Sequence, residues 1–179
     1  MASVVLITGG CRSGKSDFAQ QLAEEIPGKR LFIATCPCAD EEMELRIKNH
    51  QQARVNKGWQ SVEEPYAPAE IIAEAAAGTT ILLDCLTLWI SNLLFAAEKS
   101  GVELSEERVA LLAEELVIAA GRHDGSVLMV TNEVGLGIVP ENPLARTYRD
   151  LVGRCNQHIA AGADQVYLVS CGLPLQLKG

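Results

Sequence analysis

The chain has 179 residues, of which 48% are hydrophobic and 21% are charged, so it can bury a sizeable core and is too apolar to be disordered. Its 15 Lys and Arg against 23 Asp and Glu give a net charge of −8, which excludes general nucleic-acid binding and membrane-surface binding. The sequence has no 18-residue apolar run and no N-terminal signal pattern. We therefore expect a cytoplasmic protein with no membrane insertion and a single domain over residues 1–179.

Short apolar runs alternate with helical patterns along the chain. The predicted strands are Val4–Thr8, Leu31–Thr35, Thr80–Asp84, Val127–Thr131 and Val166–Ser170. The predicted helices are Asp17–Ile26, Asp40–Arg54, Ala67–Ala77, Leu86–Ala97, Ser105–Gly121 and a last helix beginning at Asn142-Pro143. This alternation predicts an α/β fold with a mainly parallel sheet and helices on both faces. Flexible segments are predicted only at Gln51–Pro68 and Glu98–Leu104.

The six cysteines do not form a recognisable disulfide or zinc pattern. Cys36 and Cys38 are spaced C-x-C, and no second pair completes a zinc site. We therefore predict reduced and mostly buried thiols, since free cysteine behaves as a small hydrophobic residue.

A phosphate-binding loop follows the first predicted strand. Its residues match G-x-x-x-x-G-K-[ST] and are Gly9, Gly10, Cys11, Arg12, Ser13, Gly14, Lys15 and Ser16. In such a loop the backbone N–H groups face phosphate oxygens, the lysine reaches the β- and γ-phosphates, and the serine hydroxyl ligates Mg²⁺. Asp84 ends another apolar strand, which is the position of the carboxylate that meets this Mg²⁺. The loop therefore predicts a site for a nucleoside triphosphate.

The nucleotide site alone does not define a reaction. A guanine-binding switch protein would carry an N-K-x-D clamp, and the nearest match, Asn56-Lys57-Gly58-Trp59, lacks the aspartate. The GTPase switch is thereby disfavoured, and small-molecule kinases and ATPase subunits remain.

A histidine lies on the second predicted helix, on one stripe with Met43, Ile47 and Arg54. Arg46 lies beside this stripe, so His50 has an arginine one turn before it and another one turn after it. Two nearby positive charges disfavour the imidazolium form, which would leave His50 neutral and nucleophilic, and they would also bind phosphates. By itself such a histidine is more often structural.

In combination these segments resemble the family of bifunctional adenosylcobinamide kinases and adenosylcobinamide-phosphate guanylyltransferases of cobalamin biosynthesis. The resemblance rests on the phosphate loop, the Glu42–His50 pattern, Trp59-x-x-x-Glu63, Leu82–Thr87 and Thr131–Asn142. It implies a P-loop NTPase (RecA-like) fold, ATP, GTP and Mg²⁺ as cofactors, a homotrimer, and adenosylcobinamide and adenosylcobinamide phosphate as substrates. Two alternatives stay open, which are a plain small-molecule kinase and a non-catalytic nucleotide-binding module.

The resemblance also implies roles for individual residues. The guanylylated histidine falls on His50, and Lys15 is the second catalytic residue. Beyond the phosphate loop, the guanine-nucleotide contacts fall on Ala34, Thr35, Cys36, Gln51, Gln52, Ala53, Arg54, Glu63 and Asp84, with Ser16 and Asp84 as metal ligands. Three positions depart from the pattern of some or most members: Asn49 replaces a second histidine, Val55 replaces a proline, and Asp84 replaces a glutamate. None of these changes removes a reacting group.

Thr131, Asn132 and Glu133 follow the fourth predicted strand, at the edge where α/β sheets bind ligands. Two interpretations remain open: the cluster contacts the metal or orients the substrate hydroxyl, or it is a strand-end turn that packs the following loop.

Overall fold

The structure is a computed structural model and describes residues 3–36 and 57–179. These residues build one seven-stranded sheet in the order β3-β2-β4-β5-β1-β6-β7. The strands are β1 (Val4–Gly9), β2 (Arg30–Ala34), β3 (Trp59–Glu63), β4 (Thr80–Asp84), β5 (Val127–Val130), β6 (Gln165–Ser170) and β7 (Leu173–Lys178). All neighbouring strands pair in parallel except β7, which is antiparallel to β6. The predicted parallel α/β sheet is confirmed.

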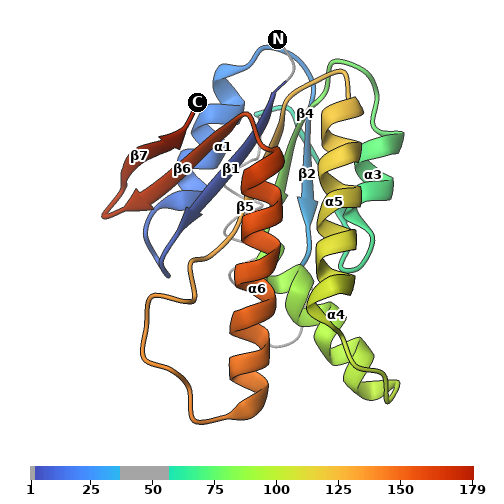
Figure 1. The fold of residues 1–179 in the computed structure, drawn as a ribbon. Helices are drawn as coiled ribbons and strands as arrows, with labels where there is room; N and C mark the ends of the chain where they lie inside the picture. The colour runs from blue at the N-terminus through green and yellow to red at the C-terminus, as the bar shows by residue number, and fades with distance from the viewer. Residues whose placement is uncertain (1–2, 37–56) are drawn as a thin grey trace.

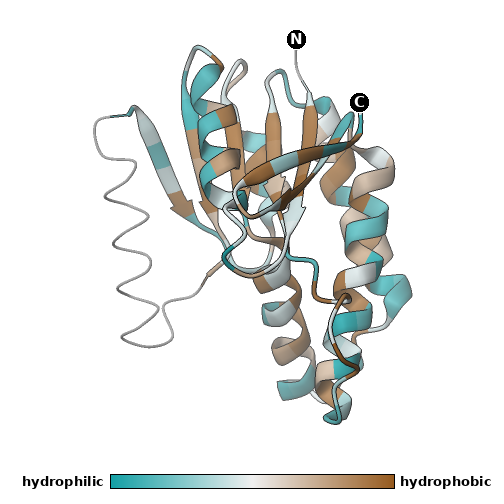
Figure 2. Cartoon of the chain, turned by 90° about the vertical axis from the view of Figure 1, so that its left-hand side faces the viewer, coloured by the Kyte–Doolittle hydropathy of each residue, from teal (hydrophilic) through white to brown (hydrophobic). Residues whose placement is uncertain are grey.

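Helices cover both faces of this sheet. They are α1 (Lys15–Glu25), α3 (Pro68–Glu74), α4 (Leu86–Lys99), α5 (Glu106–Arg122) and α6 (Pro143–Gly162). Alternate strand residues bury into two apolar clusters: Val5 and Ile7 pack with α1, whereas Val4 and Leu6 pack with the other helices. Figure 1 shows α5 and α6 lying side by side on the face opposite α1, and Figure 2 shows that the strands are mostly hydrophobic.

Two predicted helix starts are confirmed by their capping bonds. The Ser105 hydroxyl accepts a hydrogen bond from the Arg108 backbone N–H, which caps α5. The Asn142 side chain accepts from the Ala145 N–H at 3.1 Å, and Pro143 occupies the first position of α6.

The two outer strands were not predicted. β3 lies within Gln51–Pro68, so the prediction of a flexible segment is wrong for residues 59–63. It pairs with β2, and the Trp59 ring meets Phe32 edge-on at 6.3 Å between centroids. β7 follows β6 after a short turn and is exposed throughout. Edge strands carry a weaker apolar signal than central ones because they are only partly covered.

The cysteine prediction holds only in part. Cys85 and Cys155 are buried thiols, but Cys11 and Cys171 are exposed and Cys36 is half-buried. Cys11 is exposed because it lies in the phosphate loop, and Cys171 because it lies in the turn between β6 and β7. Cys38 lies outside the described residues.

The apolar helix α4 is largely buried through Leu86, Trp89, Ile90 and Leu94. Its Phe95 is 57% exposed, so the helix also presents apolar surface outward. Among the described residues, no helix is both long and apolar enough to cross a membrane.

Candidate active site at the carboxyl edge of the sheet

The phosphate loop connects β1 to α1 at the carboxyl edge, by which we mean the edge where the parallel strands end (Figure 1). Gly14 caps α1 in a left-handed conformation, φ 91°, without a side-chain hydrogen bond. The first N–H groups of the helix are therefore not capped by a side chain, and they carry the positive end of the helix dipole. The Lys15 ammonium donates a 3.0 Å hydrogen bond to the Gly10 carbonyl, which folds this side chain over the loop.

Ser13 gives independent support for anion binding by the loop. Its hydroxyl is buried and has no hydrogen-bond partner among the described residues. A buried polar atom without a partner costs free energy, so such atoms are rare in folded proteins. A phosphate oxygen is a chemically suitable partner for this hydroxyl and for the free N–H groups beside it.

The turn between β6 and β7 braces the phosphate loop, a contact that sequence analysis missed. The Gly172 N–H donates to the Ser13 carbonyl at 2.8 Å. The same glycine is so close to Gly14 that a Cβ added at Gly14 would lie 3.1 Å from its Cα. The C-terminal hairpin therefore fixes the shape of a loop at the opposite end of the sequence.

Asp84 ends β4 at the same edge and is half-buried. The pKa of the neighbouring Cys85 thiol is raised to about 11, first by burial and then by the Asp84 charge, against the opposing effects of hydrogen bonds to Thr87 and Leu88 and of the Lys15 charge. Asp84 and Lys15 thus both act electrostatically on one buried thiol. Cys85 remains protonated at neutral pH and is a packing residue rather than a nucleophile.

The other predicted nucleotide contacts divide into described and undescribed residues. Ala34 ends β2 and lies in register with Asp84 on one side and Glu63 on the other. Ala34 and Cys36 are half-buried and Glu63 is exposed, whereas Thr35 is fully buried. The whole of the predicted helix Asp40–Arg54 lies outside the described residues. It contains His50, Arg46, Gln51, Gln52, Ala53 and Arg54.

A family model described as cobinamide kinase / cobinamide phosphate guanyltransferase matches residues 5–177. The chain belongs to this family. It is 41% identical over 98% of its length to the bifunctional adenosylcobalamin biosynthesis protein CobU of Salmonella typhimurium, and covers 99% of that protein. The corresponding protein of Escherichia coli is 38% identical over the same shares of both chains. The CobP protein of Pseudomonas aeruginosa is 43% identical over 97% of this chain and 96% of its own.

Membership in the cobinamide kinase / guanyltransferase family confirms the resemblance seen in the sequence, and with it a P-loop NTPase-like fold and the use of nucleotides. Within that fold, β5 separates the phosphate-loop strand β1 from the Asp84 strand β4. The residues that follow β5 therefore lie between the end of β1, where the phosphate loop begins, and Asp84 at the end of β4. Their backbone continues the sheet, since the Glu133 N–H donates to the Gly9 carbonyl at 3.1 Å.

The side chains of this cluster bind other protein groups. Thr131 donates to the Asn156 side chain of α6 at 2.7 Å, and Asn132 donates to the Thr87 hydroxyl of α4 at 3.0 Å. The Glu133 carboxylate accepts from the Gly135 N–H at 2.9 Å. These contacts favour the strand-end turn for Thr131 and Asn132, because both side chains tie the edge of the sheet to the helices.

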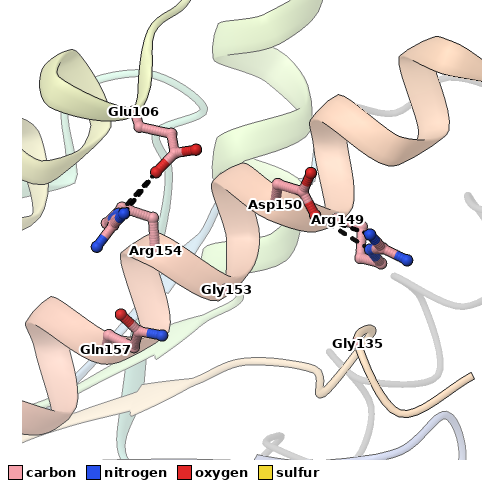
Figure 3. Close-up of a pocket in the computed structure, with 7 residues that line it drawn as sticks. All are labelled: Glu106, Gly135, Arg149, Asp150, Gly153, Arg154 and Gln157. Atoms are coloured by element: carbon pink, nitrogen blue, oxygen red, sulfur yellow. Dashed lines mark hydrogen bonds and ion pairs between the residues drawn. The ribbon is translucent and has the colours of Figure 1, made fainter. Parts of the chain in front are cut away.

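Two further cavities lie beside α6. A cavity of about 300 Å³ is lined by charged side chains, among them Glu106, Arg149 and Arg154. Figure 3 shows that its cations are paired: Arg154 lies 2.6 Å from Glu106, and Arg149 lies 3.0 Å from Asp150. A more apolar cavity of about 310 Å³ lies between α4 and the start of α6, where Leu94 and Phe95 face Leu144 and Tyr148.

We expect Gly9→Ala to distort the phosphate loop. A Cβ at this position would meet the Val169 carbonyl and the Ser13 hydroxyl, so either the loop or β6 must shift. Overpacking of this kind costs about 1–3 kcal/mol of unfolding free energy. Chemical denaturation should show that loss, and titration with a GTP analogue should show weaker binding.

Gly10→Ala is the matched control for Gly9→Ala, because its added Cβ meets nothing within 4 Å. It should leave the unfolding free energy unchanged. Equal stability of the two variants would contradict the packing geometry at Gly9.

Proposed function

We propose that this chain phosphorylates adenosylcobinamide with ATP or GTP and then transfers GMP from GTP to the resulting phosphate, giving adenosylcobinamide-GDP and pyrophosphate. The observation that carries the proposal is the family match over residues 5–177, joined to a phosphate loop with Asp84 at the same edge. Because both reactions consume nucleoside triphosphates, we propose that they occur in the cytoplasm.

In the kinase step, the substrate hydroxyl oxygen attacks the γ-phosphorus, and the bond to the β-phosphate oxygen breaks. This reaction depends mainly on positioning and on neutralising negative charge. The phosphate loop would hold the triphosphate through its N–H groups, and Lys15 would neutralise charge that develops between the β- and γ-phosphates.

The Ser16 hydroxyl and the Asp84 carboxylate are oxygen donors, which suit Mg²⁺. They would hold this ion, which when bound would neutralise phosphate charge. Asp84 suits the role because, among the described residues, its carboxylate has no hydrogen-bond or ion-pair partner.

In the transferase step, a neutral His50 nitrogen would attack the α-phosphorus of GTP and release pyrophosphate. The substrate phosphate would then attack the histidine-bound GMP, so that the transfer is split into two displacements. Arg46 and Arg54 would hold phosphates and keep the imidazole neutral. Nucleotide contacts are proposed for Ala34, Cys36, Glu63 and Gln51–Arg54.

A product assay tests the proposal. The protein is incubated with adenosylcobinamide, ATP, GTP and MgCl₂. The corrinoids are then separated and identified by mass spectrometry. We expect adenosylcobinamide-GDP. Accumulation of adenosylcobinamide phosphate alone would indicate a plain kinase, and unreacted adenosylcobinamide with bound nucleotide would indicate a binding module.

We further propose that the chain self-associates, with the trimer implied by the resemblance, through apolar surface on α4. Phe95 is 57% exposed beside the cavity that it shares with Leu144. An exposed aromatic side chain in a groove is typical of an interface anchor. Sedimentation equilibrium should give roughly three times the chain mass of 19.2 kDa.

We expect Phe95→Asp to weaken this association by about 30-fold or more, because it places a charge in an apolar contact. Leu111→Asp is the matched control, since Leu111 is 53% exposed on a different helix, α5. It should leave the assembly intact. A wild-type protein that sediments as a single chain at micromolar concentration would overturn the proposal.

A further inference from the structure

Thr35 is hydrogen-bonded to the backbone of Asp84 and Cys85. Its hydroxyl donates a 2.7 Å hydrogen bond to the Cys85 carbonyl and accepts a 2.8 Å hydrogen bond from the Cys85 N–H. The Thr35 backbone N–H also donates to the Asp84 carbonyl at 3.3 Å. One residue at the end of β2 thus binds three backbone groups at the end of β4.

These bonds and its burial prevent the Thr35 hydroxyl from donating a hydrogen bond to a nucleotide. The residue is 0% exposed, and a threonine hydroxyl has a single proton to donate, which the Cys85 carbonyl already takes. Its neighbours Ala34 and Cys36 are half-buried and keep some accessible surface. Thr35 therefore lies behind the nucleotide site rather than in it.

Other residues hold Thr35 and Cys85 in place. The Asn92 side chain of α4 donates to the Thr35 carbonyl at 2.7 Å and to the Pro65 carbonyl at 3.1 Å. The Cys85 sulfur lies 2.9 Å from the Thr87 hydroxyl, which also accepts a hydrogen bond from Asn132. The chain that leaves β4 is fixed at a point where a strand end would otherwise be free to move.

We propose that Thr35 is a positioning residue, whose hydroxyl holds the Asp84–Cys85 backbone so that the Asp84 carboxylate is oriented toward the metal-nucleotide site. The inference rests on the proposed role of Asp84 as a Mg²⁺ ligand. It assigns Thr35 a task different from the nucleotide contact that the family resemblance implies. Residues that orient a metal ligand act on metal affinity, and their loss weakens it by about 10–100-fold.

The test compares Thr35→Val, which keeps the shape and removes the hydroxyl, with Thr35→Ser, which keeps the hydroxyl. Titration calorimetry measures Mg²⁺ binding to each full-length protein saturated with α,β-methylene GTP, and binding of that nucleotide without Mg²⁺. For Thr35→Val we expect roughly tenfold weaker Mg²⁺ binding and unchanged Mg²⁺-free nucleotide binding. Thr35→Ser should stay close to wild type. Thr80→Val, a buried threonine at the opposite end of β4, is the matched control and should also behave as wild type.

If the role of Thr35 were purely structural, Thr35→Val would lower the stability of the protein. It would not weaken Mg²⁺ binding while leaving Mg²⁺-free nucleotide binding unchanged. Wild-type Mg²⁺ affinity in folded Thr35→Val, or equal losses in the serine and valine variants, would overturn the proposal. If Thr35→Val does not fold, Asn92→Ala replaces it, since it removes the support to the Thr35 carbonyl. Unchanged Mg²⁺ affinity in that variant would also overturn it.

The proposed function can fail separately from this inference. The calorimetry needs only nucleotide and Mg²⁺, so it can be interpreted even for a wild-type protein that does not transfer GMP to a corrinoid.

Discussion

Lys15→Ala should abolish both the kinase and the guanylyltransferase activity, with losses of at least about 100-fold in kcat for each. Lys15 is the first residue of α1, only 8% exposed, and its ammonium lies 3.0 Å from the Gly10 carbonyl inside the loop. If one loop holds the triphosphate for both reactions, removal of this charge leaves both transition states uncompensated. Formation of adenosylcobinamide phosphate and release of pyrophosphate from GTP measure the two activities.

The control for Lys15→Ala is Lys29→Ala, because Lys29 is exposed and lies just before β2, at the amino edge of the sheet. It removes the same charge and should keep both activities. Near-normal rates for Lys15→Ala in either assay would contradict a shared nucleotide site.

His50→Ala should lose the transferase by at least about 1,000-fold and substantially keep the kinase. Phosphoryl transfer to a hydroxyl requires the phosphate loop, a metal and an oriented substrate, none of which is a histidine. Guanylyl transfer through a covalent intermediate requires a side chain that carries GMP, and alanine offers no lone pair. The assay follows adenosylcobinamide phosphate and adenosylcobinamide-GDP in one reaction mixture.

The chain has two other histidines, His123 and His158, and neither is positioned to act as the nucleophile. His123 is 8% exposed and its Nε2 lies 2.7 Å from the Thr79 carbonyl, at the opposite end of β4 from Asp84. His158 is exposed near the C-terminal end of α6, so His158→Ala is the matched control and should keep both activities.

Arg46→Ala and Arg54→Ala should slow guanylylation without abolishing it, because these residues hold phosphates and form no bond to phosphorus. Equal loss of kinase and transferase in His50→Ala would contradict a covalent role.

The sequence predicts the central strands, the helix caps and the phosphate loop of this fold well, because each of them depends on residues that are close together in the chain. β4 spans Thr80–Asp84, the bounds that the sequence predicts around the apolar run Ile81–Leu83, since a central parallel strand is covered on both faces. The caps at Ser105 and Asn142 are local, with donor and acceptor three residues apart. The local sequence is therefore enough to predict them. The phosphate loop is equally local, and its spacing predicts its geometry.

The parts that sequence analysis missed depend on contacts between distant residues. β3 and β7 are edge strands whose pairing partners define them more than their own residues do. The brace from Gly172 to Ser13 joins residues far apart in the chain, and nothing local marks it. Thr35 looks like a polar residue at a strand end, which is typical of a ligand contact, and only its two bonds to Cys85 reveal it as a buried support.

The most direct test of the central claim is to incubate the protein with MgCl₂ and GTP labelled at the α-phosphate, without any corrinoid. We expect one acid-labile, alkali-stable label per chain, as a phosphoramidate would give, and we expect peptide mapping to place it on His50. The label should leave as adenosylcobinamide-GDP when adenosylcobinamide phosphate is added. A protein that binds GTP but takes up no label, or a His50→Ala variant that takes it up as wild type does, would contradict the account.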